Sequence, residues 1–393
     1  MREVVIASGC RTPIGCFGGA LSSISATRLG AIVVEEAVSR ASLQKGDIDE
    51  VIMGCILTAG LGQAPARQAA LFAGLPETVE CMTINKVCGS GLKAVMLASQ
   101  AILLGDADVI VAGGMESMSN APYLLDKARS GYRMGHAQLI DSMIKDGLWD
   151  VYNDFHMGIA GELCSKECGV PREAQDDFAM MSYQRALEAQ KKCLFKDEIV
   201  PLKITGRGGE VTTVSEDEEP GKVKFEKIRT LKPAFQKDGT ITAANASKIN
   251  DGAAALVVMS QEKAKSLGIK PLARVIGFSS SAKKPEWFTT APADVIPKVL
   301  KKVGLTLSDI DLFEVNEAFA VVNLAVNKML GLDPAKVNVN GGAVALGHPI
   351  GASGARILVT LLNAMKQQTA RRGLAAICIG GGEASAMVVE RQP

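Results

Sequence analysis

A cysteine flanked by glycines stands in the segment Asn85-Lys-Val-Cys88-Gly-Ser-Gly91-Leu-Lys-Ala, ahead of a run of good helix formers. This pattern predicts that Cys88 lies at a strand-to-helix turn, where unpaired N–H groups and the helix dipole favour a thiolate. Gly89 and Gly91 are expected to permit a tight turn and the close approach of a substrate. The segment favours a nucleophile, and the alternative is a buried structural cysteine.

A histidine is held in a second glycine-rich segment, Asn340-Gly-Gly-Ala-Val-Ala-Leu-Gly-His348-Pro-Ile-Gly. The segment lacks the Lys-Ser/Thr ending of a P-loop. Because His348 stands between Gly and Pro, its position is fixed, which suits a general base or an oxyanion donor. The alternative is a histidine whose hydrogen bonds are satisfied within a packed turn.

Two further segments carry polar groups at the ends of strand-like runs. Cys378 follows Ala376-Ile and precedes Ile-Gly380-Gly-Gly-Glu, where backbone N–H groups can face a developing negative charge. Asn316, in Glu314-Val-Asn316-Glu, can hold a water or a carbonyl, or it can cap the following helix. Together with Cys88 and His348, these residues favour acyl transfer through a thioester. No dinucleotide-binding or P-loop motif competes with this interpretation.

The composition excludes several classes of protein. The 393 residues include 43 Lys and Arg against 42 Asp and Glu, so nothing indicates a surface for nucleic acid or an anionic membrane. Nine scattered cysteines, an odd number, argue against a disulfide framework and for the cytoplasm. No metal site is expected, because histidines are few and Cys164 with Cys168 falls short of the four ligands of zinc. Neither a signal peptide nor a membrane-spanning run is expected.

The elements that must position these residues follow an alternating pattern. Apolar runs at 4–7, 51–53 and 109–112 predict buried strands, and residues 27–39 and 91–104 predict helices. This alternation is typical of α/β layers, and continuous apolar strands indicate a sheet covered on both faces.

An internal repeat is the most informative feature of this organisation. Three segments recur in order at nearly constant separation, and they align Asp47 with Asp309, Ser90 with Ser353, and Val111 with Cys378. The repeat predicts two copies of one βα-layered unit, with an insertion between them. We expect a first half at 1–118 plus 250–270, an inserted loop domain at 119–249, and a second half at 271–393.

These motifs resemble the thiolase superfamily along essentially the whole chain, from Arg11-Thr-Pro-Ile-Gly to Cys378-Ile-Gly-Gly-Gly-Glu. The resemblance implies two βαβαβαβ halves in a five-layer α/β/α/β/α sandwich, with the loop domain binding CoA. It implies a reversible ping-pong condensation of two acetyl-CoA to acetoacetyl-CoA and CoA, with no cofactor required. A homotetramer built from tight dimers is implied as well.

The resemblance also assigns roles to residues. Cys88 would carry the acetyl group, and His348 would activate Cys88. Cys378 would exchange the Cα proton of the second acetyl-CoA. Each of the two thiols would titrate close to the working pH. Asn316 would hold a water in an oxyanion hole, while the N–H groups of Cys88 and Gly380 would form another. The residues implied to contact CoA or the acyl chain are Leu148, His156, Met157, Leu231, Phe235, Ala243, Ser247, Phe288, Ala318 and Phe319.

At positions 288 and 183, Phe288 and Tyr183 are similar to the residues of those superfamily members that bind K⁺ and accept 2-methylacetoacetyl-CoA. The positions implied for K⁺, a possible activator, are Tyr183, Ala243, Ala244, Ala246 and Val344. The runner-up is a degradative 3-ketoacyl-CoA thiolase, against which His156 and Met157 argue. A decarboxylating ketoacyl synthase has no matching use for Cys378, and the intact set of reactive residues argues against an inactive CoA-binding protein.

Overall fold

Two similar halves make up the computed structural model, which describes residues 2–206 and 208–391. The sheet of the first half contains β1 (Val4–Arg11), β3 (Glu50–Gly54), β4 (Glu80–Ile84), β5 (Val109–Ser117) and β12 (Asn250–Ser260), with β2 (Gly15–Cys16) beside β12. The sheet of the second half contains β13 (Ala273–Ala282), β14 (Leu312–Val315), β15 (Arg372–Ile379) and β16 (Glu383–Glu390). The strands predicted at 4–7, 51–53 and 109–112 are confirmed as parts of β1, β3 and β5.

The halves share one topology. The strand order β3-β5-β12-β1 in the first half corresponds to β14-β15-β16-β13 in the second, with β4 as an additional strand beside β3, and β1 pairs with β13 at the junction. Corresponding pairs run in the same sense: β3 with β5 and β14 with β15 are parallel, whereas β5 with β12 and β15 with β16 are antiparallel. Beside β14, at the place that β4 takes beside β3, the described residues form an isolated parallel bridge between Phe313 and Val337.

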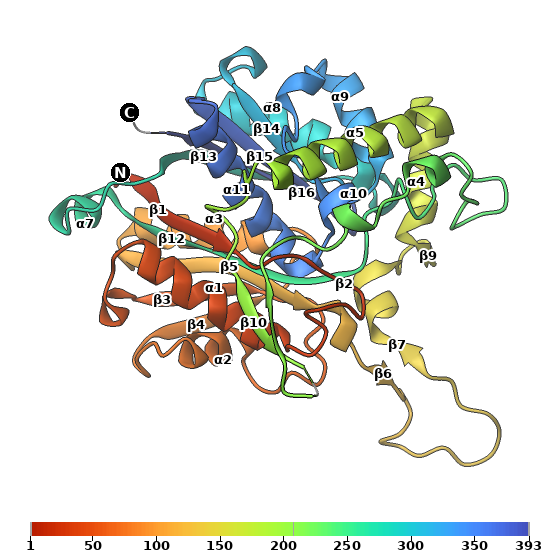
Figure 1. Cartoon of the computed structure of the whole chain (residues 1–393), viewed down its shortest axis with the longest axis horizontal. Coiled ribbons are helices and arrows are strands. Elements are labelled where there is room, and N and C mark those ends of the chain that lie inside the picture. Colours follow the sequence, from red (N-terminus) through yellow and green to blue (C-terminus); the bar gives the residue numbers. More distant parts are fainter. Residues whose placement is uncertain (1, 207, 392–393) are drawn as a thin grey trace.

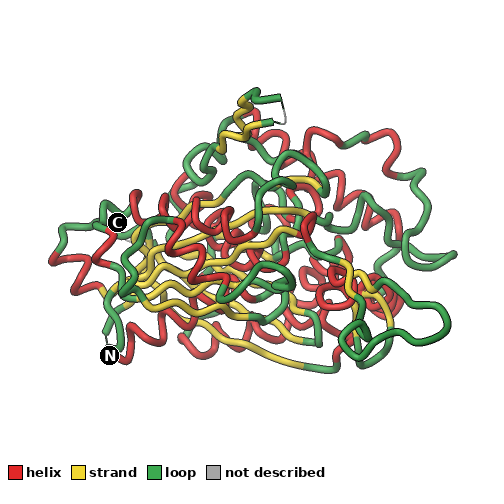
Figure 2. Tube along the Cα trace, turned by 90° about the horizontal axis from the view of Figure 1, so that it is seen from below, coloured by secondary structure: helices red, strands yellow, loops and turns green. Residues whose placement is uncertain are grey.

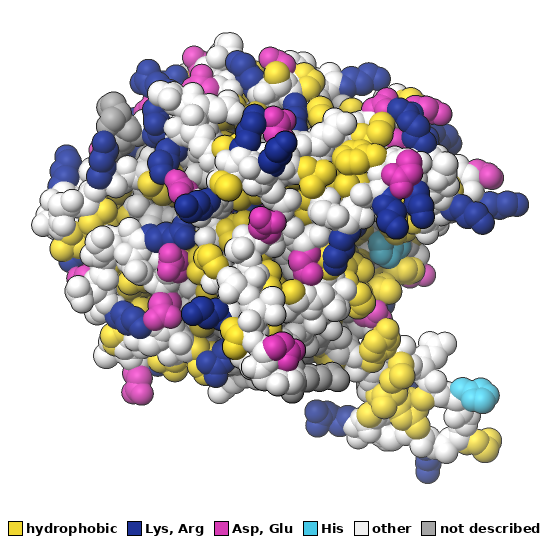
Figure 3. All heavy atoms as spheres, viewed as in Figure 1, with side chains coloured by type: hydrophobic (Ala, Val, Ile, Leu, Met, Phe, Trp, Pro, Cys, Tyr) yellow, Lys and Arg dark blue, Asp and Glu magenta, His cyan; other side chains and the backbone are white. Residues whose placement is uncertain are grey.

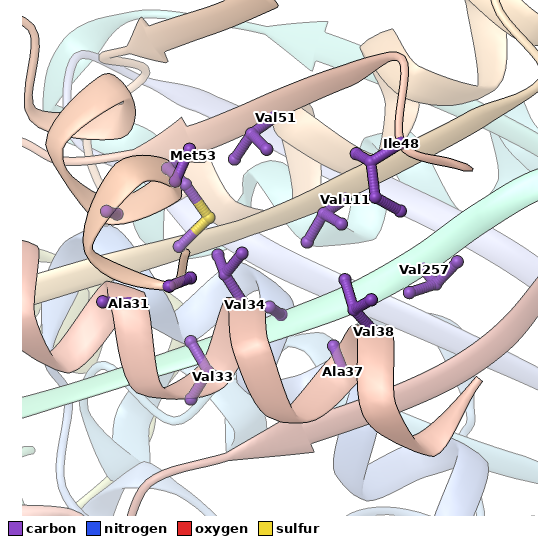
Figure 4. Close-up of a cluster of buried hydrophobic side chains, with 14 of the residues drawn as sticks. Ala31, Val33, Val34, Ala37, Val38, Ile48, Val51, Met53, Val111 and Val257 are labelled. Carbon is purple, nitrogen blue, oxygen red and sulfur yellow. The ribbon is translucent and has the colours of Figure 1, made fainter. Parts of the chain in front are cut away.

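Helices fill the layers around and between the sheets (Figures 1 and 2). One outer layer holds α1 (Ala26–Arg40) and α2 (Pro65–Phe72), the middle holds α3 (Ser90–Leu104) and α11 (Ile350–Gln367), and the other outer layer holds α8 (Ala291–Val303) and α9 (Ala320–Leu330). Three apolar clusters separate these layers. In the first, Val34 and Val38 of α1 pack toward Val51, Val111 and Val257 of the sheet (Figure 4). The five-layer sandwich predicted from the sequence is therefore confirmed.

The middle layer depends on two glycines that the repeat aligns. A Cβ atom on Gly91 would lie 2.6 Å from the backbone nitrogen of Ala355, and one on Gly354 would lie 2.3 Å from that of Leu92. The two helices cross here with their backbones almost in contact, so Gly91 serves helix packing and not the approach of substrate that we expected. Residues 87–104 are apolar enough for a membrane span by length and composition, and α3 lies between the two sheets.

Residues 119–249 lie outside the repeated unit. They contain β6 (Tyr123–Leu124), β7 (Ile140–Asp141), β8 (Trp149–Asp150), β9 (Phe155–His156), α4 (Met157–Cys168), α5 (Arg172–Lys191), β10 (Leu202–Thr205), β11 (Val211–Val214) and α6 (Phe225–Ile228). The chain between β6 and β7 forms an arm that extends away from the body (Figure 1). β12 then returns to pair with β1 and β5, and α7 (Gln261–Ser266) follows it.

Candidate active site

A cavity of about 450 Å³ lies where the two halves meet residues 119–249. Cys88, His348 and Gly380 line it together with most of the predicted ligand-contacting residues: Leu148, His156, Met157, Phe235, Ala243, Ser247, Phe288, Ala318 and Phe319. Leu231 does not line this cavity; it follows α6, and its carbonyl oxygen accepts a hydrogen bond from Arg172 at 2.9 Å. Cys378 and Asn316 are buried behind the lining.

Cys88 stands immediately before α3, as the sequence predicts. Val87 precedes it with a φ of 43°, which is unusual for a β-branched residue and marks a sharp turn. The backbone N–H groups of Cys88 and Gly380 lie close enough to the Cys88 sulfur to lower its pKa. These are the two donors that the resemblance assigns to an oxyanion, so an acyl oxygen formed on this sulfur would lie beside them.

Burial, and not the helix N-terminus, decides the protonation of Cys88. Burial raises the pKa of Cys88 to about 11, and the charge of Glu116 adds to this effect, while the two N–H donors oppose it. Burial also raises the pKa of the Cys378 thiol, and a thiolate on the neighbouring Cys88 would raise it further. Both thiols are therefore protonated in the ligand-free protein, which corrects the expectation that each titrates close to neutral pH.

The tautomer of His348 follows from its neighbours. The Ser353 hydroxyl donates to the Pro349 carbonyl at 2.9 Å, so its oxygen accepts the proton on His348 Nδ1, 2.6 Å away. The lone pair then lies on Nε2, which is buried and has no partner among the described residues. Burial and the charge of Arg356 lower the pKa of His348 to about 3. A neutral imidazole with an open Nε2 is suited to take a proton from Cys88.

The backbone of His348 is fixed by a residue that the sequence analysis missed. Asn250 of β12 accepts the His348 N–H at 2.9 Å and donates to the carbonyl of Gly15 at 2.9 Å. Gly347 has a φ of 111°, and a Cβ atom there would lie 2.5 Å from the Asn250 side chain. The sequence shows Asn250 next to Asp251 at the start of the returning strand, and this position is the only local indication of a role. Local pattern alone does not show that Asn250 contacts His348.

Asn316 is oriented by a buried ion pair. Arg356 donates to Glu314 at 2.8 Å and to the Asn316 Oδ1 at 3.4 Å, which leaves the Asn316 Nδ2 as a buried donor without a partner among the described residues. The helix that follows begins at Ala320 with Phe319 as its N-cap, so Asn316 is not the cap. An amide nitrogen free to donate fits the expected contact with a water or an oxyanion.

Glu116 is a second buried group that the sequence analysis missed. Its carboxylate accepts the N–H groups of Ile56 and Leu57 at 3.1 Å each and that of Gly351, at the start of α11, at 3.0 Å. Burial raises the pKa of Glu116 to about 7. This side chain joins β5 to the helix that follows His348.

An aromatic wall lines one part of the cavity. His156 stacks on Phe235 with ring centroids 4.8 Å apart, and Phe319 meets Phe235 at 6.1 Å and Phe288 at 6.5 Å. His156 Nδ1 accepts the N–H of Gly158 at 3.1 Å and so caps α4, and burial lowers the pKa of His156. The side chain is therefore a neutral part of the wall.

Two of the oxygens expected to bind K⁺ already hold a cation of the chain itself. Lys248 Nζ donates to the carbonyl oxygens of Ala246 at 2.7 Å and Val344 at 3.2 Å, and it lies over the Tyr183 ring. Burial lowers the pKa of Lys248 to about 8. Because the ammonium group uses these oxygens, K⁺ does not fit at this site.

Cys164 and Cys168, the pair considered for a metal, have sulfurs 3.8 Å apart on α4. The described residues contain no group of three or more potential metal ligands.

The protonation of Cys88 leads to a testable pH dependence. The rate at which iodoacetamide alkylates Cys88 is expected to rise about tenfold per pH unit from about pH 6 to about pH 9, because the reactive thiolate fraction grows in that proportion below a raised pKa. Peptide mass spectrometry measures alkylation of Cys88 separately from alkylation of the exposed Cys193. Cys193 serves as the reference for a thiol that the reagent reaches freely. A plateau at neutral pH would mean that the thiolate is already formed in the free protein.

The sequence matches two family models, described as "Thiolase, N-terminal domain" over residues 4–262 and "Thiolase, C-terminal domain" over residues 269–391. It is 54% identical to the acetyl-CoA acetyltransferase of Cupriavidus necator over 393 residues, covering both chains completely. It is 54% identical to acetyl-CoA acetyltransferase 1 of Arabidopsis thaliana over 391 residues, covering 99% of this chain and 94% of that protein. The crystal structure of Acat5 thiolase from Ascaris suum in complex with coenzyme A matches it with a TM-score of 0.95 and 45% identity over all of both chains.

Proposed function

The chain belongs to the thiolase family, with the family's fold along its whole length, and we propose that it is an acetyl-CoA C-acetyltransferase. It joins two acetyl-CoA to acetoacetyl-CoA and CoA, reversibly. The observation that carries this proposal is the convergence of Cys88, with its two N–H donors, and the open Nε2 of His348 on one cavity. Relatives at 51–54% identity over their full length are named acetyl-CoA acetyltransferase.

The first half-reaction transfers an acetyl group to Cys88. His348 Nε2 takes the thiol proton as the sulfur attacks the thioester carbonyl of acetyl-CoA. The resulting oxyanion has two buried donors available, Asn316 Nδ2 through a water and His348 itself, and CoA leaves with the proton. The carbonyl oxygen of acetyl-Cys88 then lies beside the N–H groups of Cys88 and Gly380.

The second half-reaction forms the carbon–carbon bond. Cys378 first passes its thiol proton to the neutral Nε2 of His348, and the resulting thiolate removes a Cα proton from the second acetyl-CoA. The carbanion attacks the acetyl carbon on Cys88, whose sulfur leaves as a thiolate and takes the proton back from His348, so the free enzyme returns with both thiols protonated. Because the pKa of Cys378 is raised in the free protein, proton removal requires bound substrate and the oxyanion donors to lower its cost.

The experiment that tests this function is steady-state thiolysis of a chain-length series, with isolation of the acetylated peptide. We expect acetoacetyl-CoA to be preferred over longer 3-ketoacyl-CoA substrates, because the wall of His156, Phe235, Phe319 and Phe288 encloses the acyl end. The 2-methyl analogue belongs in the series as a probe of Phe288. Saturation by long chains but not by acetoacetyl-CoA would instead support the degradative 3-ketoacyl-CoA thiolase.

The proposal includes a cytoplasmic homotetramer. The nine cysteines are free, which suits a reducing compartment. The arm between β6 and β7 carries the exposed apolar side chains Leu125, Tyr132, Met134 and Leu139, which a second dimer would cover (Figure 3). Elsewhere on the same face, acidic and basic side chains are interspersed (Figure 3). Sedimentation velocity measures the assembly directly.

A further inference from the structure

Lys248 is a charged residue at the cavity to which the proposed reaction gives no role. It follows Ser247 and lines the cavity, and its Nζ is held by the carbonyl oxygens of Ala246 and Val344. The same nitrogen lies 5.5 Å from the centroid of the Tyr183 ring. An ammonium group here meets two carbonyl dipoles and an aromatic face, both of which favour a cation.

The oxygens around Lys248 form a site suited to one monovalent cation. Backbone carbonyl oxygens replace the water around K⁺ in the same way as they accept the N–H bonds of an ammonium group. The carboxylates whose charge acts on Lys248 are Glu219, which also lines the cavity, and Glu317. A potassium ion bound to the oxygens of Ala246 and Val344 would collide with Nζ, which lies 2.7 Å and 3.2 Å from them.

The two carbonyls belong to segments with different tasks. Ala246 precedes Ser247, which is expected to contact the pantetheine. Val344 lies in α10 (Ala343–Leu346), which ends just before Gly347 and His348. The N–H of Val344 is held in turn by Glu317 at 3.1 Å. A cation between these carbonyls therefore ties the substrate-binding segment to the segment that carries the base.

We propose that the Lys248 ammonium is a tethered monovalent cation that takes the place of K⁺ and positions the His348 segment against the Ser247 segment. Lys248 is a positioning residue, and the inference rests on the proposed function for its catalytic consequence. The enzyme consequently works without added K⁺.

The test compares salts and variants. Wild-type thiolysis and melting temperature are expected to be equal in KCl, NaCl and tetramethylammonium chloride at one ionic strength. Lys248→Ala opens the site, and kcat/KM is expected to fall roughly tenfold or more in tetramethylammonium chloride because His348 is misplaced. KCl is expected to restore most of this loss and to raise the melting temperature of Lys248→Ala. Lys248→Met fills the space without a charge, so its loss is expected to persist in KCl.

Lys302 supplies a matched control. Its Nζ donates to the carbonyl of Phe278 at 3.0 Å and lies over the Phe278 ring, on α8 and outside the cavity. Lys302→Ala is expected to keep wild-type kcat/KM and to show no specific response to K⁺.

Three results would overturn the inference: activation of the wild type by K⁺ over tetramethylammonium, full activity of Lys248→Ala without K⁺, or equal recovery of Lys248→Met in KCl. If Lys248→Ala does not fold, the wild-type salt series and Lys248→Met still show whether Lys248 takes the place of K⁺. A wild type inactive in every salt would refute the proposed function, whereas the melting temperatures in KCl would still test Lys248.

Discussion

Replacing Cys88 by serine is expected to lower kcat/KM for thiolysis of acetoacetyl-CoA on the order of 10⁴-fold or more. The thiol is already hard to ionise, since burial raises its pKa to about 11. A serine hydroxyl in the same place is far less acidic than this thiol. The neutral imidazole of His348 can take a proton from a thiol during attack but has little driving force to take one from a hydroxyl. The measurement is steady-state thiolysis together with mass spectrometry of the acetylated peptide.

Cys10→Ser is the matched control for this loss. Cys10 is a buried thiol on β1 that donates to the carbonyl of Val33, and it does not line the cavity. The control variant is expected to retain activity and to bind no acetyl group at residue 10. If Cys88→Ser kept its thiolysis rate, or if the acetyl group were found on another residue of the wild type, Cys88 would not be the nucleophile.

Replacing Cys378 by alanine is expected to separate the two half-reactions. Acetyl transfer to Cys88 needs no proton at Cα, so exchange of labelled CoA into acetyl-CoA should persist within about tenfold of wild type. Condensation and thiolysis both pass through the Cα proton, so they should fall on the order of 10²–10⁴-fold. The cost falls on proton transfer, because Cys378 is a buried thiol close enough to Cys88 for a charge on one sulfur to raise the pKa of the other.

Cys164→Ala is the control for packing near Cys378. Cys164 is fully buried on α4 and its charge also acts on Cys378, but it has no assigned part in the reaction. This variant is expected to keep both half-reactions. Equal loss of exchange and of condensation in Cys378→Ala would show that the residue serves structure or acetylation, and would contradict its role as the acid and base of the second step.

The raised pKa values change the expected resting state of the enzyme. At neutral pH the free protein holds two protonated thiols and a neutral imidazole, because burial disfavours the thiolates and the imidazolium alike. Because the pKa of Cys88 is raised and that of His348 is lowered, burial disfavours an ion pair between the two before substrate binds. Activation depends on the donors that face the reacting oxygen and not on a thiolate formed in advance.

The sequence by itself determined the architecture and the reacting groups. The repeat that aligns Asp47 with Asp309 predicted two copies of one βα-layered unit, and the matching strand pairings β3-β5-β12-β1 and β14-β15-β16-β13 confirm it. Strand and helix positions followed from apolar periodicity, which is a local property of the chain. Cys88, His348 and Cys378 could be selected because unusual residues beside glycines mark turns, and turns at strand ends face a common edge, whereas the role of Gly380 came from the resemblance.

Only the tertiary structure decided how these groups are held and charged. Asn250 fixes His348, Arg356 orients Asn316, and Lys248 occupies the oxygens of Val344, in each case across a long separation in the chain. The protonation of Cys88 reversed the expectation from its helix N-terminus. Desolvation depends on all the atoms packed around a group, whereas the helix dipole can be predicted from neighbouring residues. Local pattern therefore identified the reacting atoms, and packing between distant segments determined their pKa values and orientations.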